Sequence, residues 1–103
     1  MDRFKLMTRQ PFRVQAVLNG HDAADGNPLV QVQYEPDGNC IRVLRDGSLV
    51  RGRWRFANSQ QTQVEVEGPE GPTRWVIIQL DEHVYRRADI DTGLELIHRP
   101  VVR

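Results

Sequence analysis

The sequence predicts an all-β domain in which about eight antiparallel strands follow one another as an up-and-down meander and form a small closed or partly open barrel. Short runs of alternating apolar and polar residues recur between Phe12 and Val101, the pattern of half-buried strands. Turn signals rich in Gly, Pro, Asp and Asn separate these runs, and no helix of normal length fits between them. Because consecutive strands must protect their edges, we expect the sheet to close on itself.

The strands are expected between successive turn signals. The expected strands are residues 12–18, 29–35, 40–45, 48–56, about 61–67, 73–80, about 84–89 and about 94–101. The connections are the loop at 19–28, the turn at 36–39, Asp46 with Gly47, residues 57–60, the Pro- and Gly-rich break at 68–72 and the turn at 91–93. Segment 1–11 is expected to be an N-terminal extension or cap. Its residues 2–8 form either one helical turn that plugs an end of the sheet with Phe4 and Met7, or a frayed tail.

Composition places the chain in a broad class. A length of 103 residues suits a single domain, 1–103, with its own core. The 14 basic and 14 acidic residues cancel, which argues against general nucleic-acid or anionic-membrane binding. Cys40 is the single cysteine, which favours a reducing compartment. The N-terminus lacks the apolar run of a secretory signal and no stretch has the length of a transmembrane helix. We therefore expect a soluble, bacterial, cytoplasmic protein.

Strand alternation predicts which side chains face inward. The residues expected to share one interior are Val30, Val32, Tyr34, Ile41, Val43, Val50, Trp54, Val64 and Val66. Cys40, Arg42 and Leu44 are then expected outside. If Asp46 and Gly47 form a two-residue turn, Arg42 lies directly opposite Arg51.

A series of short features runs in order through residues 12–101. They are Leu18-Asn19-Gly20 after the first strand, Pro36-Asp37-Gly38 at a turn, Gly52-x-Trp54, Trp75-x-Ile77-x-x-Leu80, and Thr92-Gly93-x-Glu95 before the last strand. This series resembles the calycin superfamily, in particular small bacterial lipocalin-like or streptavidin-like β-barrel domains. The resemblance implies a barrel that binds small apolar molecules in its interior. The Gly-x-Trp feature lies mid-chain here, whereas it lies at the first strand of typical lipocalins, and the cysteine pair of secreted lipocalins is absent.

Aromatic residues are the candidates for lining a ligand cavity. They are Tyr34, Trp54, Phe56, Trp75 and Tyr85, whose faces supply apolar area and, in Trp and Tyr, a polar group. The same side chains could instead fill the core, since a small barrel is just wide enough to be filled by its side chains. A pocket of roughly 300 Å³ or more, reached past the 19–28 loop, would favour a ligand. A filled interior would favour a protein-interaction or structural module.

An arginine-rich stripe is the second candidate site. Arg42, Arg51 and Arg53 are expected on the outer face, where they could hold an anion or an acidic partner. Alternatively they belong to a cross-strand ladder of ion pairs. Pairing Trp54 with Val64 would place Arg53 opposite Glu65 and Arg51 opposite Glu67.

No motif for catalysis or metal binding stands out. His21, His83 and His98 are separated along the chain, and Cys40 has no neighbouring residues that would support it as a nucleophile. We therefore expect no enzyme, no catalytic residue, no metal and no cofactor. Leu44 and Leu49 could form a patch for a weak homodimer of an otherwise monomeric protein. The predicted function is binding of a small apolar molecule in the barrel, and the alternative is an interaction or structural module with a filled core.

Overall fold

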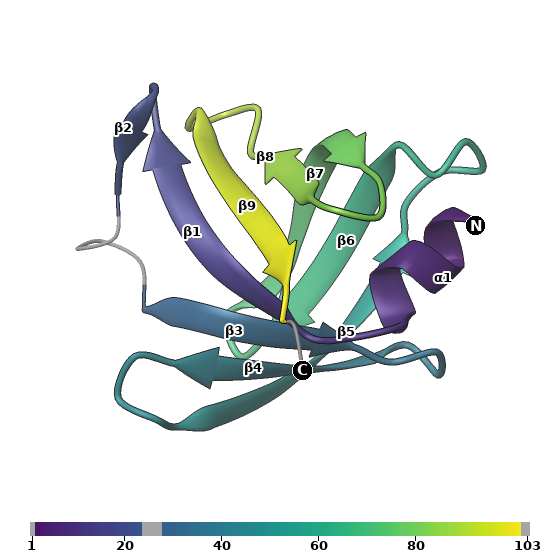
Figure 1. The fold of residues 1–103 in the computed structure, drawn as a ribbon, viewed down its shortest axis with the longest axis horizontal. Coiled ribbons are helices and arrows are strands. Elements are labelled where there is room, and N and C mark those ends of the chain that lie inside the picture. The colour runs from purple at the N-terminus through teal and green to yellow at the C-terminus, as the bar shows by residue number, and fades with distance from the viewer. Residues whose placement is uncertain (1, 24–27, 102–103) are drawn as a thin grey trace.

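The computed structural model describes residues 2–23 and 28–101, which form a closed antiparallel barrel with one short flanking strand (Figure 1). The elements are α1 (Arg3–Thr8), β1 (Phe12–Leu18), β2 (His21–Asp22), β3 (Leu29–Tyr34), β4 (Asn39–Leu44), β5 (Leu49–Phe56), β6 (Gln63–Gly68), β7 (Gly71–Leu80), β8 (Tyr85–Ala88) and β9 (Leu94–Pro100). The strand order is β2-β1-β3-β4-β5-β6-β7-β8-β9, and a further pairing joins β1 to β9. The predicted all-β barrel is confirmed.

Closure of the barrel depends on the pairing of β1 with β9. The two strands are in register along their full lengths, from Phe12 opposite Pro100 to Leu18 opposite Leu94. In Figure 1 they lie side by side, although they come from opposite ends of the chain. The pairing satisfies backbone groups that would otherwise form two free sheet edges.

Part of the expected 19–28 loop is a strand. Asn19 and Gly20 both have positive φ, 51° and 81°, as a tight hairpin turn requires. This turn brings His21 opposite Leu18 and forms β2. The prediction of an uninterrupted connection was therefore wrong, because Asn-Gly is itself a hairpin signal. Residues 24–27 of the expected loop lie outside the described part of the chain.

The expected inside and outside of β4 are reversed in the structure. Ile41 and Val43 were predicted to face inward, but Cys40 is fully buried and Arg42 pairs with the inward-facing Val50. The hairpin between β4 and β5 has a three-residue loop, in which Gly47 has a φ of 87°. Leu44, just before the loop, forms backbone hydrogen bonds with both Gly47 and Ser48. This loop shifts the pairing by one residue relative to a two-residue turn, and a one-residue shift exchanges the two faces of a strand.

Two consequences of this reversal correct the predicted arginine contacts. Arg42 lies opposite Val50 rather than Arg51, and the cross-strand partner of Arg51 on β4 is Ile41. The predicted pairing of Arg42 with Arg51 is therefore absent from the ladder. A further difference occurs in β3, where an irregularity between Leu29 and Gln31 buries Leu29 and leaves Val30 only half-buried.

The pairing of β5 with β6 differs from the prediction by two residues. Trp54 lies opposite Val66 rather than Val64. A shift of two keeps every side chain on its predicted face but changes its partner. Glu65 is therefore paired with Arg55, not with Arg53. Glu67 is paired with Arg53, not with Arg51.

Segment α1 lies against one end of the barrel (Figure 1). Met7 is completely buried, and the Phe4 ring stacks on Trp54 with 5.7 Å between ring centres. The Asp2 side chain caps the helix by accepting a hydrogen bond from the Lys5 amide. Of the two expectations for residues 2–8, the helical turn is the one observed. The turns that join β4 to β5 and β6 to β7 lie at the opposite end.

Candidate functional site at the open end of the barrel

The register around the barrel identifies the inward-facing positions of every strand. Starting from Phe12, the pairs continue through Val32, Arg42 and Val50 and return through Arg87 and Leu96 to Ala16. The inward-facing polar or titratable side chains at the described strand positions are Tyr34, Cys40, Arg42, Trp54, Thr73, Trp75, Tyr85, Arg87 and His98. No Asp or Glu occurs among the inward-facing positions of the described strands. The interior therefore contains two cationic side chains and no carboxylate.

A network of polar and aromatic side chains fills the centre of the barrel. Arg87 is only 3% exposed and donates a hydrogen bond of 2.9 Å to the Tyr34 hydroxyl, which also bonds His98 Nε2 at 3.1 Å. The Arg87 guanidinium lies over the Trp75 ring, and a weaker contact of 3.5 Å reaches the Tyr85 hydroxyl. These contacts fill the space in which the sequence predicted an apolar ligand.

Burial shifts the acid–base properties of this network. It lowers the pKa of His98 well below its usual 6.5, an effect that nearby Arg87 reinforces. It raises the pKa values of Tyr34 and Tyr85, while Arg87 opposes the rise. For Arg87 burial alone would lower the pKa, but the Tyr34 and Tyr85 hydroxyls reverse the shift, so the guanidinium stays charged. At neutral pH the network therefore consists of a cation and neutral partners.

A cavity of about 290 Å³ lies at the open end of the barrel. It is lined by Pro28, Arg42, Leu44, Val50, Val66, Gly68, Pro69, Glu70, Gly71 and Thr73. Most of these residues are inward-facing positions of β4 to β7 or belong to the turn between β6 and β7. The cavity is thus the unfilled mouth of the barrel interior, and Pro28 at the end of the 19–28 connection forms part of its rim.

Arg42 reaches into the space that two glycines leave open. A Cβ atom added to Gly68 would lie 2.1 Å from Arg42 Nη2, and one added to Gly52 would lie 3.3 Å from the same atom. The guanidinium therefore packs directly against backbone that any larger residue would fill. Its Nε and Nη2 atoms are buried and have no hydrogen-bond partner among the described residues. Arg42 is thus a cationic donor in the wall of the cavity with unused hydrogen-bonding capacity.

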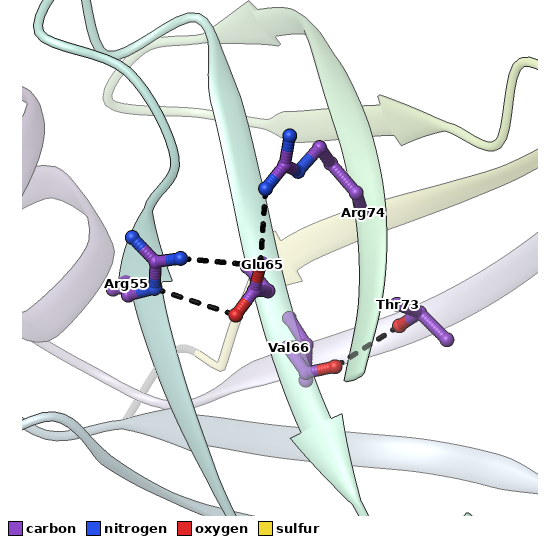
Figure 2. Close-up of polar contacts among 5 residues, drawn as sticks. All are labelled: Arg55, Glu65, Val66, Thr73 and Arg74. Carbon is purple, nitrogen blue, oxygen red and sulfur yellow. Dashed lines mark hydrogen bonds and ion pairs between the residues drawn. The ribbon is translucent and has the colours of Figure 1, made fainter. Parts of the chain in front are cut away.

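The hydroxyl of Thr73, in contrast, is already used. Thr73 Oγ1 donates to the Val66 carbonyl across the β6–β7 pair at 3.1 Å, as Figure 2 shows. It also accepts a hydrogen bond of 2.9 Å from Trp75 Nε1. The cavity wall therefore offers apolar side chains and the positive charge of one arginine.

The predicted arginine patch does not form. Arg42 is inside the barrel, whereas Arg51 and Arg53 are exposed on the outer face of β5. Arg53 donates to the Asn39 side chain at 3.1 Å. The three side chains therefore face different sides of the sheet and cannot hold one anion together.

An ion-pair ladder of the predicted kind exists two residues farther along β5. Arg55 and Arg74 converge on Glu65 from the strands on either side, at 3.2 and 3.3 Å (Figure 2). Hydrogen bonding from Arg74, supported by Arg55, lowers the pKa of Glu65. Glu65 therefore has both guanidinium groups as partners on the solvent-exposed face.

The five aromatic candidates lie mainly in the core. Tyr34, Trp54, Trp75 and Tyr85 are buried and Phe56 is half-buried, and none of the five lines the cavity at the open end. Trp54 and Phe56 border a separate, outer hollow of about 520 Å³ beside α1. That hollow is also lined by Arg53 and Arg55 and by Asp37, Glu65 and Glu67, so its carboxylates outnumber its guanidinium groups by one. The predicted role of the five aromatic residues in ligand binding stays a prediction.

Two further observations concern metal ions and membranes. The described residues contain no cluster of three or more His, Cys, Asp or Glu side chains that could hold a metal ion. Within residues 2–23 and 28–101 there is also no helix with the length and apolar character needed to span a bilayer.

Comparison with known proteins gives a match in fold. No protein-family model matches the sequence, and no curated protein is detectably similar to it. The structure is similar to the crystal structure of a lipocalin-like protein from Bacteroides uniformis, with a TM-score of 0.64 over 93% of this chain and 99% of that chain at 16% sequence identity. The chain has a lipocalin-like fold. The predicted resemblance to lipocalin-like barrels is therefore confirmed.

Sequence reasoning missed most of the residues that line the mouth of this lipocalin-like barrel. Arg42 and Leu44 were placed outside because the alternation was interpreted with Ile41 and Val43 facing inward, and a two-residue loop at Asp46 and Gly47 agreed with that choice. The combination of Arg45, Asp46 and Gly47 also fits a three-residue loop ending in a glycine with positive φ, which would have placed both residues inside. The possible three-residue loop was therefore the sequence signal for an inward-facing Arg42 and Leu44.

Proposed function

We propose that this barrel binds a small organic ligand at its open end and does not catalyse a reaction. The observation that carries the proposal is the cavity of about 290 Å³, which is lined by inward-facing residues of four neighbouring strands. The cavity lies at the lower limit of ligand pockets, which is roughly 300 Å³, so it could hold only a small molecule. The lipocalin-like fold supports the proposal, because up-and-down barrels of this size commonly hold one ligand inside.

The walls of the cavity favour a ligand that is mostly apolar. Leu44, Val50 and Val66 contribute aliphatic surface, and Thr73 has its hydroxyl engaged with Val66 and Trp75. Burial of apolar ligand surface against such side chains would supply most of the binding free energy. The filled centre beneath the cavity limits the ligand to the mouth of the barrel.

Binding of the neutral fluorophore N-phenyl-1-naphthylamine tests this function. We expect its fluorescence to rise on binding to the wild-type protein, and the Val50→Trp variant to weaken binding at least tenfold by filling the cavity. Leu49→Trp is the matched control, because the adjacent Leu49 is 67% exposed and lies on the outer face. This variant should bind like the wild type.

The folded state of each variant is checked by circular dichroism. If Val50→Trp does not fold, Leu44→Phe replaces it as a smaller obstruction of the same cavity. Absence of dye binding to the wild type, or equal binding by the filled and control variants, would contradict the proposal. In either case the interaction module with a filled core would become the better account.

A further inference from the structure

The charge of Arg42 has no counter-ion among the residues that the structure describes. Within the described residues, the ion pairs of 4 Å or less involve Arg55, Arg74 and Arg86. Arg42 takes part in none of them, and its Nε and Nη2 atoms are both buried and unpartnered. A guanidinium group stays charged at any physiological pH, so Arg42 cannot avoid the cost of burial by losing its proton. An anion in the adjoining cavity would offset this charge.

The rest of the interior strengthens the attraction for an anion. Arg87 is a second buried cation, its Nε is also unpartnered, and its nearest polar partners are tyrosine hydroxyls. Both Arg42 and Arg87 act electrostatically on the buried Cys40 thiol, so the two charges lie in the same part of the barrel. Because the inward-facing positions of the described strands include no carboxylate, these charges are not neutralised from within.

We propose that the ligand is an apolar monoanion whose acidic group pairs with Arg42 at the mouth of the barrel. Its hydrocarbon part would lie against Leu44, Val50 and Val66. This inference rests on the proposed function and adds the chemical class of the ligand. Glu70 is the carboxylate of the cavity lining, but it is exposed at the β6–β7 turn and forms no ion pair with Arg42. Arg42 is thus the group that would recognise the acid.

Competition between two probes with the same chain length tests the inference. Octanoate and 1-octanol are each used to displace N-phenyl-1-naphthylamine at pH 7, where the carboxylic acid is ionised. In the wild type, octanoate should displace the dye at about one tenth of the concentration that 1-octanol requires, the usual size of a charge-assisted hydrogen bond. In Arg42→Gln the two probes should be equally effective.

The control variant is Arg51→Gln, which removes the same charge from the outer face and should keep the tenfold preference. Arg42→Lys, which retains the charge without the planar fork, should keep part of it. A second readout is the ¹⁵N–¹H signal of Arg42 Nε, assigned by its loss in Arg42→Gln. This signal should shift when octanoate is added and remain in place with 1-octanol.

The outcomes separate the two proposals. If the dye binds at the cavity but octanoate and 1-octanol displace it equally from the wild type, the monoanion is ruled out and the binding function stands. The monoanion at Arg42 is equally ruled out if Arg42→Gln retains the preference or if the Nε signal does not move. If the neutral dye itself does not bind, the proposed function fails before the charge is tested.

Discussion

The guanidinium of Arg87 lies 4.7 Å from the centre of the Trp75 ring, inside the barrel. Its hydrogen-bond acceptors are the Tyr34 and Tyr85 hydroxyls, which are neutral groups. A buried charge with only neutral partners loses more solvation than it regains, although stacking on an aromatic ring offsets part of the loss. The centre of the barrel is therefore filled at some cost to stability.

Replacing Arg87 with methionine should increase the stability of the protein. Methionine has a similar length and brings no charge, so Arg87→Met is expected to raise the free energy of unfolding by about 1–2 kcal/mol. Arg87→Ala should lower it instead, because it leaves a cavity beside Trp75. Urea denaturation followed by tryptophan fluorescence measures both changes. A less stable Arg87→Met variant would show that the arginine contacts outweigh the cost of burying the charge.

Acidification should destabilise the protein through His98. This side chain is fully buried, and its lowered pKa keeps it neutral in the folded state. The unfolded chain takes up a proton at His98 as the pH falls below about 6.5, so the unfolded state then binds more protons than the folded state. Stability present above pH 6.5 is therefore lost as the pH falls toward the lower, folded-state pKa.

The variant His98→Gln should show a smaller loss of stability between pH 6.5 and 5 in denaturation experiments. His83→Gln, at an exposed turn position, is the matched control and should behave like the wild type in this interval. Carboxylates with lowered pKa values, such as Asp37 and Glu65, contribute at more acidic pH. Parallel pH profiles for the wild type and His98→Gln would contradict the assignment.

Gly47 should contribute to the stability of the protein through its backbone conformation alone. Its φ is 87°, and a Cβ atom at this position would have no neighbour within 4 Å. Gly47→Ala is therefore expected to lower the free energy of unfolding by about 1 kcal/mol through backbone strain. Gly47→Asn should cost less, because asparagine tolerates this conformation. Thermal denaturation of the two variants gives the comparison, and an equal cost would point to another cause.

The packing of α1 should depend on Met7 more than on Phe4. Met7 is completely buried, so Met7→Ala is expected to lower the free energy of unfolding by about 2–4 kcal/mol. Phe4 stacks on Trp54 but is 38% exposed, and Phe4→Ala should cost less. Chemical denaturation tests the order of the two effects. Equal stability of the Met7→Ala variant and the wild type would mean that the helix is not docked in solution.

The fold could be predicted because alternation along a strand reports burial on one face. In β5 the alternation predicted the inward face correctly. The residues that face the interior, as their spacing indicates, are Val50, Gly52, Trp54 and Phe56. It failed in β4, where apolar and polar residues occur on both faces and the alternation has no single interpretation. There the face depends on the length of the next turn, and one residue in a turn has no hydrophobic signature of its own.

The candidate site was less predictable for the same reason. Arg42 occupies an inward position only because Gly52 and Gly68 leave room for its guanidinium. In the sequence, Gly52 stood out only as part of the Gly52-x-Trp54 feature, and Gly68 was assigned to a break between strands. The contact joins residues from three strands, so it depends on two registers at once. Local sequence patterns contain no information on such a combination.

The pairing of β1 with β9 also affects how the chain folds. Gln15 and Arg99 are 84 positions apart yet share a hydrogen bond, so the barrel can close only after nearly all of the strands have been synthesised. Until then the outer edge of β1 and the growing end of the meander remain open to pairing with other chains. Contacts of such long sequence separation slow folding. A nascent chain on the ribosome would therefore expose two unpaired sheet edges throughout most of its translation.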